Sequence, residues 1–326
     1  MACLCLSFPA GVTAEEPLKI SGKTMGSYYA LVIDSPGGIN RERLQAEIES
    51  TFEKINRQMS TWDESSQISE FNRSRSTEWF PVGADFAAVA QEAKRLHVVT
   101  QGAMDVSVAP LINLWGFGKK KRRTLPKDEE ISAALKGVGM QHVEVRLDPP
   151  AIRKQLPDLQ LSFSALAPGY AVDEVCKILR THQLKSYVVD VGGENRAGDA
   201  KGNGDAWRLG VESPLGGLHK IVELTNLAIA TSGDYRNFFM AGGKKYSHAI
   251  DPKTGRPVEN PPACVSVIHE SCMTADGMAT AMMVLGVEKG TEVARASGVD
   301  VMFLEVTADG TLTECSTGVF QAATTP

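Results

Sequence analysis

Residues 273–286 read MTADGMATAMMVLG, and this stretch carries the clearest structural signal in the chain. Its apolar residues recur at helical spacing, so it predicts a helix over about 274–285 with Thr274 as N-cap and Asp276 in the first turn. Thr280 follows four residues after Asp276 and shares its helix face. A carboxylate and a hydroxyl one turn apart offer hard oxygen ligands to Mg²⁺. Spacing alone favours the simpler interpretation, an acidic first-turn residue and a helical threonine.

The pattern around this helix predicts an α+β fold with mixed or antiparallel sheets and packed helices. Helices are expected over about 40–59, 84–100, 169–183 and 288–297, with a short one from near Asp128. Strands are expected at 17–33 (interrupted by Gly22 and Gly26), 186–193, 207–213, 220–231 and 264–270, and as a hairpin over about 299–315. Helices interrupt the strands irregularly, which argues against a strict βαβ series.

Composition describes an ordinary globular protein. The 326 residues are 43% hydrophobic and 22% charged, and the net charge of -5 gives no basic footprint for nucleic acid. No apolar run reaches the roughly 20 residues that a membrane helix needs.

The N-terminus resembles the end of a secretory leader. Residues 1–16 are small and apolar, then acidic, and Val12-Thr13-Ala14 fits a cleavage site. Cys3 or Cys5 could instead accept a lipid, as in a lipoprotein. We therefore expect a leader remnant at 1–16 and a single domain over 17–326.

Of the remaining cysteines, Cys176 falls on the apolar side of a predicted helix and is expected in the core. Cys264 and Cys272 are candidates for a disulfide if the protein is exported.

A second group of candidate residues surrounds His248. In SHAIDPKTGRPVE (residues 247–259), His248 precedes a tight turn, and an uncharged imidazole could accept a hydroxyl proton there. Most isolated histidines are structural or exposed, so this alternative stays open.

Glycine-bearing turns and aromatic rings provide further candidates. ALAPGYAVDEV (165–175) places Gly169 where a turn enters a helix, and Gly192-Gly193 follow a buried strand, so backbone could approach a ligand closely at both. Neither turn fits a Rossmann or P-loop pattern. TSGDYRN (231–237) offers Ser232 and Arg236 as phosphate donors. Trp62 and Trp115 could stack on a ligand or pack in the core.

The order of eight motifs resembles the ApbE family of FAD:protein FMN transferases, from residue 20 to about 305. The motifs are GKTMGSYY (22–29), MSTWDESSQISEFN (59–72), GAMDVSVAPLINLWGFG (102–118), ALAPGYAVDEV, VVDVGGENRAG (188–198), ATSGDYRNF (230–238), SHAIDPKTGRPVE and ADGMATAMMVLG (275–286). Each motif is weak alone, and the ordered set is specific.

The resemblance implies a fold related to the tunnelling-fold enzymes and a periplasmic location, often as a lipoprotein anchored to the inner membrane. Family members use Mg²⁺ to cleave the diphosphate of FAD and attach FMN through a phosphoester to a Thr or Ser of a target flavoprotein, releasing AMP. Targets are subunits of membrane redox complexes of the Rnf, sodium-pumping NADH dehydrogenase or NosR type, with an acceptor segment like S/T-G-A-S/T.

The resemblance also implies roles for particular residues. The metal ligands would be the side chains of Asp276 and Thr280 and the main-chain carbonyl of Ala167. The FAD pocket would be lined by Met25, Trp62, Asp105, Gly193 and Ser232, to which the residue patterns above add Gly169 and Arg236 as candidates. His248 would lie beside the reacting phosphate as the candidate base.

Three positions depart from the family pattern. Ser162 stands where an acidic residue is usual, Pro168 where Lys or Glu is commoner, and Trp62 where Tyr is frequent. Pro168 leaves the Ala167 carbonyl available, whereas Ser162 changes the hydrogen bonding of its loop. Two alternatives remain: a pyrophosphatase that releases FMN and AMP without an acceptor, and a non-catalytic flavin-binding protein of the envelope.

Overall fold

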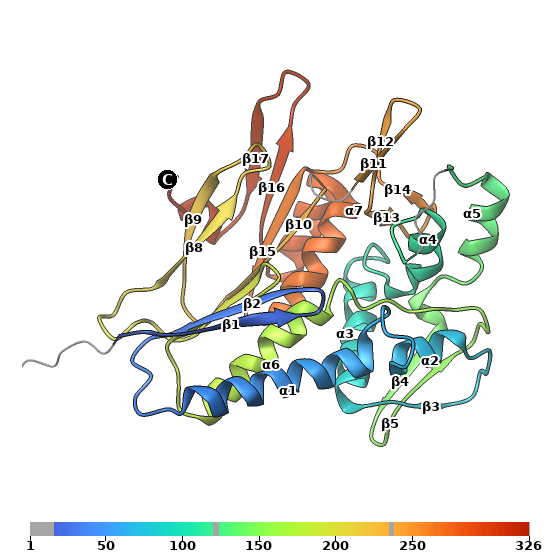
Figure 1. Ribbon diagram of the computed structural model, residues 1–326. Coiled ribbons are helices and arrows are strands. Elements are labelled where there is room, and N and C mark those ends of the chain that lie inside the picture. Colours follow the sequence, from blue (N-terminus) through green and yellow to red (C-terminus); the bar gives the residue numbers. More distant parts are fainter. Residues whose placement is uncertain (1–15, 120–123, 235–237, 326) are drawn as a thin grey trace, which may run out of the picture.

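The computed structural model describes residues 16–119, 124–234 and 238–325 (Figure 1). Nearly all of the expected leader, residues 1–16, and the candidate phosphate donor Arg236 lie outside these ranges. Of the helices within them, none is both long and apolar enough to cross a membrane.

An eight-stranded sheet forms the centre of the molecule. In sheet order its strands are β1 (Leu18–Thr24), β2 (Ser27–Ile33), β6 (Tyr187–Val191), β7 (Glu194–Ala197), β10 (Ala228–Gly233), β15 (Cys264–His269), β16 (Asp300–Val306) and β17 (Leu312–Ser316). Every neighbouring pair is antiparallel. The α+β fold with antiparallel sheets is therefore confirmed.

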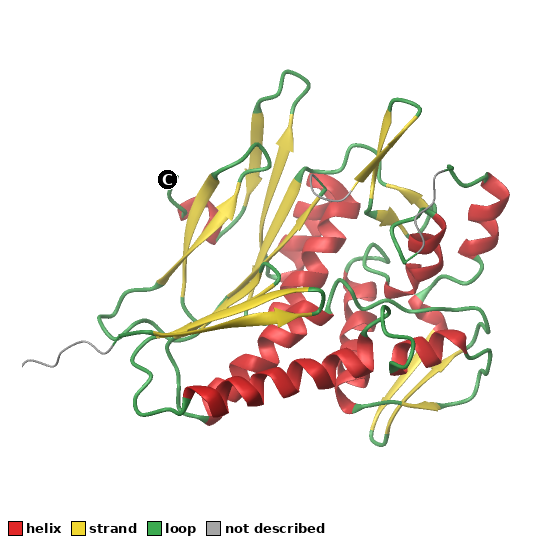
Figure 2. Ribbon diagram, viewed as in Figure 1, coloured by secondary structure: helices red, strands yellow, loops and turns green. Residues whose placement is uncertain are grey.

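Helices cover one face of this sheet (Figure 2). The helical layer consists of α1 (Arg41–Met59), α6 (Ala167–Thr181) and α7 (Cys272–Ser297), which contact the sheet, and α3 (Ala84–Val99), which packs against α1 and α7. The other face is covered by β8 (Trp207–Glu212), β9 (Leu218–Leu224) and α8 (Val319–Ala322). Alternate residues of β15 face the two layers: Val265 and Val267 pack with the helices, and Cys264 and Ile268 pack with the β8–β9 side.

The smaller elements lie beyond the helical layer. They are α2 (Gln67–Arg73), β3 (Phe80–Pro81), η1 (Val106–Val108), α4 (Ala109–Leu114), α5 (Asp128–Leu135), η2 (Met140–His142), β4 (Val143–Leu147), β5 (Pro150–Lys154), β11 (Phe238–Ala241), β12 (Lys244–Ser247), β13 (Ile250–Asp251) and β14 (Arg256–Pro257). Trp115 belongs to a small core here and donates its indole N–H to the Gly255 carbonyl at 2.8 Å. Trp115 is thus a core residue, not an exposed stacking ring.

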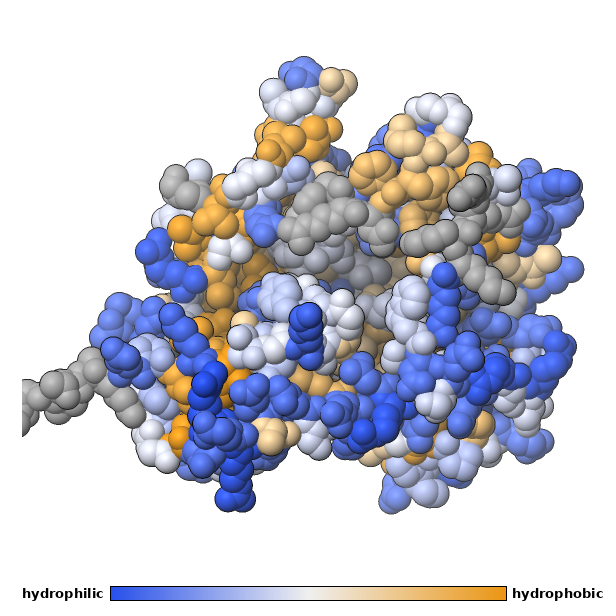
Figure 3. All heavy atoms as spheres, viewed as in Figure 1, coloured by the Kyte–Doolittle hydropathy of each residue, from blue (hydrophilic) through white to orange (hydrophobic). Residues whose placement is uncertain are grey.

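On the face shown in Figure 3, hydrophobic surface gathers on strand hairpins. The space-filling view shows hydrophilic side chains over α1 and hydrophobic ones at the β11–β12 and β16–β17 hairpins (Figure 3). Phe238 and Met240 of β11 and Val306 of β16 are among these exposed side chains.

The interrupted strand predicted at 17–33 is a hairpin. Met25 and Gly26 join β1 to β2, with φ angles of 50° and 72°. Two successive left-handed residues match a two-residue turn whose twist suits antiparallel strands. The backbone thus reverses at Gly26, whereas Gly22 stays inside β1.

Helix α7 contains both helices predicted over 274–285 and 288–297. They join at Gly286, which has φ 73° and ψ -177° and breaks the helical backbone. The prediction of Thr274 as N-cap is wrong. Ser271 caps the helix and accepts a hydrogen bond from the Thr274 N–H at 3.3 Å. The Thr274 hydroxyl instead donates to Glu92 at 2.7 Å. Asp276 consequently lies just beyond the first turn.

The candidate disulfide between Cys264 and Cys272 is not formed. Cys264 begins β15 and Cys272 begins α7, so the whole strand separates them. A six-residue strand spans roughly 20 Å, far more than the approximately 7 Å limit between the Cα atoms of a disulfide. Cys176 is buried in the core, as predicted.

Candidate active site

Three adjoining cavities open beside the helical layer. The acidic cavity, about 370 Å³, is lined by Asp105, Glu194, Ser232, His248, Asp276 and Thr280, among others. The apolar cavity, about 550 Å³, is lined by Met25, Ile55, Met59, Trp62, Phe163 and Ala167, among others. The outer cavity, about 430 Å³, includes Trp62, Asn72 and Ser162. Ser164 lines the first two, and Ser162 lines the acidic and outer cavities. Together they are large enough for a dinucleotide, since ligand sites span about 300–1,000 Å³.

Asp276 is a buried acid in the acidic cavity whose pKa is raised. Its side chain is only 6% exposed, and Oδ2 accepts a hydrogen bond from the Gly169 N–H at 3.2 Å. Burial, and then the neighbouring charge of Glu194, raise the pKa of Asp276 well above its ordinary value. A cation placed between the two carboxylates would remove this electrostatic repulsion.

Gly169 brings the first turn of α6 against the first turns of α7. A Cβ on Gly169 would lie 2.5 Å from the Cys272 carbonyl oxygen, so a side chain does not fit. Ala167, two residues earlier, is the first residue of α6 and lines the apolar cavity. Pro168 lies in the same first turn, where its missing N–H is tolerated.

Thr280 and Ser232 meet in the acidic cavity. Thr280 lies on α7 one turn beyond Asp276, and Ser232 lies on β10 of the main sheet. Their hydroxyl oxygens are 3.3 Å apart. The predicted shared face of Asp276 and Thr280 therefore exists, and the sheet adds a further hydroxyl to it.

His248 lies between β12 and β13 in the wall of the same cavity. Its Nδ1 is 4.0 Å from Oδ1 of Asp234, and its ring packs edge-to-face with Phe117 at 6.3 Å between centroids. Asp234 is almost fully buried and also pairs with Lys245 at 2.5 Å. Asp234 is not among the residues predicted from the sequence, although it stands in the TSGDYRN motif two residues after Ser232.

Glu194 is a second residue that the sequence argument missed. It begins β7 directly after Gly192-Gly193 and lines the acidic cavity. Burial raises the pKa of Glu194, and Asp190 adds to the effect. Gly193 has φ 112° and donates its N–H to Asp190 at 2.9 Å. The sequence signal that could have identified Glu194 is a buried strand that ends in two glycines followed by an acidic residue.

Asp105 lines the acidic cavity but has structural partners. Oδ1 accepts the Ser107 N–H at 2.8 Å, and Oδ2 accepts the Met140 N–H at 3.1 Å. Oδ2 also lies 3.3 Å from His97 Nδ1, and this carboxylate is the main reason that the pKa of His97 is raised. The side chain of Asp105 thus shapes the wall of the cavity by holding these neighbours.

Met25 and Trp62 lie together at the apolar cavity. Met25 occupies the left-handed turn between β1 and β2, and Trp62 is 67% exposed in a loop after α1. Trp62 also lines the outer cavity with Ser162, whose hydroxyl donates to Ser164 at 3.2 Å. An exposed ring beside a cavity is available for stacking, unlike the buried Trp115.

The oxygen donors of the acidic cavity fit a hard cation. Within residues 16–119, 124–234 and 238–325, no group of three or more His, Cys, Asp and Glu side chains could hold a metal ion. The available set is instead the buried carboxylate of Asp276, with that of Glu194 in the same cavity, together with hydroxyls and backbone carbonyls. Such oxygen-only donors suit Mg²⁺, which keeps few protein ligands and takes others from phosphates and water.

A cleft of this size, with convergent carboxylates, hydroxyls and a histidine, has the form of an enzyme active site. The chain belongs to the ApbE family, whose sequence model matches residues 25–303. The chain is accordingly an enzyme.

Curated relatives and solved structures agree with this assignment. A protein of Vibrio cholerae named FAD:protein FMN transferase is 41% identical over 300 residues, covering 90% of this chain and 89% of that protein. The apo form of the Pseudomonas stutzeri flavinyl transferase ApbE is 36% identical, with a TM-score of 0.88, covering 96% of this chain and 98% of that one. The flavin transferase ApbE from Vibrio cholerae is 39% identical, with a TM-score of 0.85, over 94% and 99% of the two chains.

Proposed function

We propose that this protein transfers FMN from FAD to a Thr or Ser hydroxyl of a target flavoprotein. The observation that carries the proposal is the meeting of Asp276, Thr280, Ser232 and His248 in one cavity that adjoins the apolar cavity. The isoalloxazine ring would occupy the apolar cavity beside Trp62 and Met25, and the diphosphate would occupy the acidic one. The names of the curated relatives support this activity.

In the proposed reaction, the bond between the FMN phosphorus and the bridging oxygen breaks, and AMP leaves with that oxygen. A new bond forms between the phosphorus and the acceptor Oγ, whose proton passes to the protein. The carboxylate of Asp276, the hydroxyl of Thr280 and the carbonyl of Ala167 are the proposed ligands of Mg²⁺. When bound, the ion supplies positive charge to the phosphoryl oxygens.

We assign the acceptor proton to His248. Asp234 lies on the Nδ1 side of the ring, so Nε2 is the nitrogen that we assign to the acceptor hydroxyl. The Asp234 carboxylate favours the imidazolium that forms when the proton arrives. Asp276 is less suited to this role, because a carboxylate bound to a metal holds a proton weakly.

Location and partner rest on the resemblance and the N-terminal sequence. We propose that the protein is periplasmic and that its N-terminus is either a cleaved leader or a lipid anchor in the inner membrane. The proposed acceptor is an S/T-G-A-S/T-like segment of a membrane redox-complex subunit of the Rnf, sodium-pumping NADH dehydrogenase or NosR type.

Mass spectrometry tests the activity and the partner together. Candidate envelope flavoproteins are incubated with this protein, FAD and Mg²⁺, and one is expected to gain the mass of one FMN on a Thr or Ser. If the Vibrio cholerae relative modifies an acceptor that this protein leaves unmodified, the proposal fails. Free FMN released at a rate that no acceptor improves would indicate a pyrophosphatase, and stable FAD binding without turnover a flavin-binding protein.

A further inference from the structure

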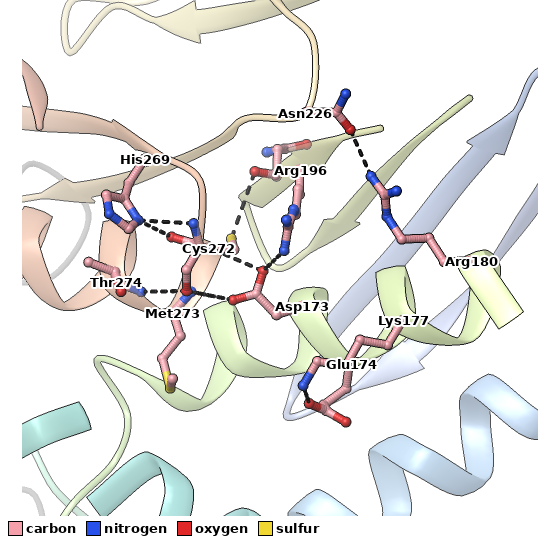
Figure 4. A network of polar contacts seen from close by, with 12 residues as sticks. Asp173, Glu174, Lys177, Arg180, Arg196, Asn226, His269, Cys272, Met273 and Thr274 are labelled. Carbon is pink, nitrogen blue, oxygen red and sulfur yellow. Dashed lines mark hydrogen bonds and ion pairs between the residues drawn. The ribbon is translucent and has the colours of Figure 1, made fainter. Parts of the chain in front are cut away.

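One buried carboxylate, that of Asp173, joins three elements that carry the candidate site (Figure 4). Asp173 lies on α6 and is 7% exposed. Its Oδ1 accepts from the Arg196 guanidinium of β7 and from the Cys272 N–H at 3.0 Å. Its Oδ2 accepts from the Ser271 hydroxyl at 2.8 Å and from the Met273 N–H at 3.1 Å.

These bonds place the Asp173 side chain at the N-terminus of α7. The first N–H groups of a helix have no acceptor within the helix, and Asp173 accepts from those of Cys272 and Met273. Ser271 takes the next one, from Thr274. A negative charge is also favourable at this end of a helix, and Arg196 neutralises it within a buried site. The cap of α7 is thus supplied partly by another helix.

The same bonds fix how α6 lies against α7. Gly169 and Asp173 are one turn apart on α6, and their partners on α7, Asp276 and the Cys272–Met273 pair, are also about one turn apart. These two sets of hydrogen bonds hold the helices in a single register. A sliding of α7 along α6 would break both sets and move Asp276 relative to Ala167.

We propose that Asp173 is a positioning residue for the cation site: it holds the α7 carboxylate of Asp276 at the start of α6, where Ala167 lies. This inference rests on the proposed function, because that function places Mg²⁺ between these two helices. Removing a group that hydrogen-bonds a metal ligand directly typically lowers metal affinity by about 10–100-fold. Asp173 acts through Ser271, Cys272 and Met273 and not on a ligand itself, so its loss should fall near the lower end of that range. A simple helix cap would affect stability alone.

The test is the affinity of the full-length protein for Mn²⁺, measured by electron paramagnetic resonance, with Mg²⁺ as competitor. Asp173→Asn keeps the size of the side chain but removes its charge and turns a donor group toward the donors of α7. We expect its cation affinity to fall by about 10-fold. Asp173→Glu, which keeps the charge but displaces it by one methylene, provides a second variant and should show a smaller loss.

Asn226→Ala is the matched control. Asn226 accepts a hydrogen bond from Arg180 at 2.7 Å, near the other end of α6 (Figure 4), and has a left-handed φ of 56°. Alanine there loses the bond and strains the backbone by about 1–2 kcal/mol, so the variant is destabilised without touching the α6–α7 register. Its Mn²⁺ affinity should equal that of the wild type.

Two results would overturn the inference: wild-type affinity in every Asp173 variant that folds, or the same loss of affinity in Asn226→Ala. Thermal unfolding of each variant shows which of them fold. A wild-type protein that binds no divalent cation would instead remove the metal site of the proposed function, and this inference with it.

Discussion

The acidic and apolar cavities are built differently, although they adjoin. Asp276 and Thr280 of the acidic cavity lie on one long helix, and Ser232 lies on the central sheet, with hydrogen bonds joining these elements. In the apolar cavity, Met25 lies in a hairpin turn and Trp62 in a loop with two-thirds of its surface exposed. Catalytic groups need positions fixed to within about 0.5 Å, whereas a stacking ring tolerates more freedom. Substitutions at the two ends should therefore have different kinetic effects.

Asp276→Ala should give the largest effect and abolish Mg²⁺-dependent FMN transfer. The substitution removes the only carboxylate among the proposed metal ligands. It also leaves the buried Gly169 N–H without its acceptor, at a cost of about 1–3 kcal/mol. Asp276→Asn is the matched control for stability, since its amide oxygen can still accept from Gly169 but carries no charge. Full transfer activity in either variant would contradict the assigned site.

His248→Ala should lower the rate of transfer by about 10²–10⁴-fold, the usual contribution of a general base. The affinity for FAD should change much less, because the ring is assigned to the acceptor hydroxyl and not to the flavin. Rates are measured at saturating FAD across pH. If the wild-type rate does not vary with pH in the range where histidine titrates, His248 has no role in proton transfer.

Glu194→Gln should relieve repulsion at the acidic end in the absence of metal. The folded state raises the pKa of Glu194, so it retains a proton that the unfolded chain has already lost. Wild-type stability should therefore decline as pH rises from about 4.5 towards 7. The glutamine variant should show a smaller decline, because burial still raises the pKa of Asp276 and of Asp190. At pH 8 the metal-free variant should be more stable, on the order of 1 kcal/mol or more. Urea unfolding at several pH values measures the difference. If the wild type and the variant had the same pH dependence of stability, the pKa of Glu194 would not be raised in the folded state.

The same contrast explains what the sequence could predict. Apolar residues at helical spacing predict helices α1, α3 and α6. The shared face of Asp276 and Thr280 follows from their separation of four residues. Both are local properties, which periodicity reports directly. The start of α7 was misjudged because Ser271 and Thr274 are both good N-caps. Burial and the tertiary contact with Asp173 decide between such candidates, and neither is visible in a local pattern.

Contacts between distant segments could not be derived from spacing. Asp234 and Glu194 stand in motifs that attracted attention for their neighbours, and only the fold brings them to His248 and Asp276. The motif around Asp105 predicts a residue of the FAD pocket, but no local pattern indicates that Ser107, Met140 and His97 share its carboxylate. The acidic end depends on such long-range bonds, so sequence reasoning was weakest where the chemistry is concentrated.

Trp62→Ala should have the smallest effect, confined to flavin binding. Stacking of one aromatic ring contributes about 0.5–1.5 kcal/mol beyond burial, so the KM for FAD should rise roughly 2–10-fold with little change in kcat. Trp62→Tyr is the matched control, because it keeps an aromatic ring at this position and should bind FAD almost as well as the wild type. Steady-state kinetics and quenching of flavin fluorescence separate the two parameters. A fall in kcat equal to that of His248→Ala would mean that the apolar cavity also positions the reacting phosphate. The two cavities would then not have separate roles in binding and catalysis.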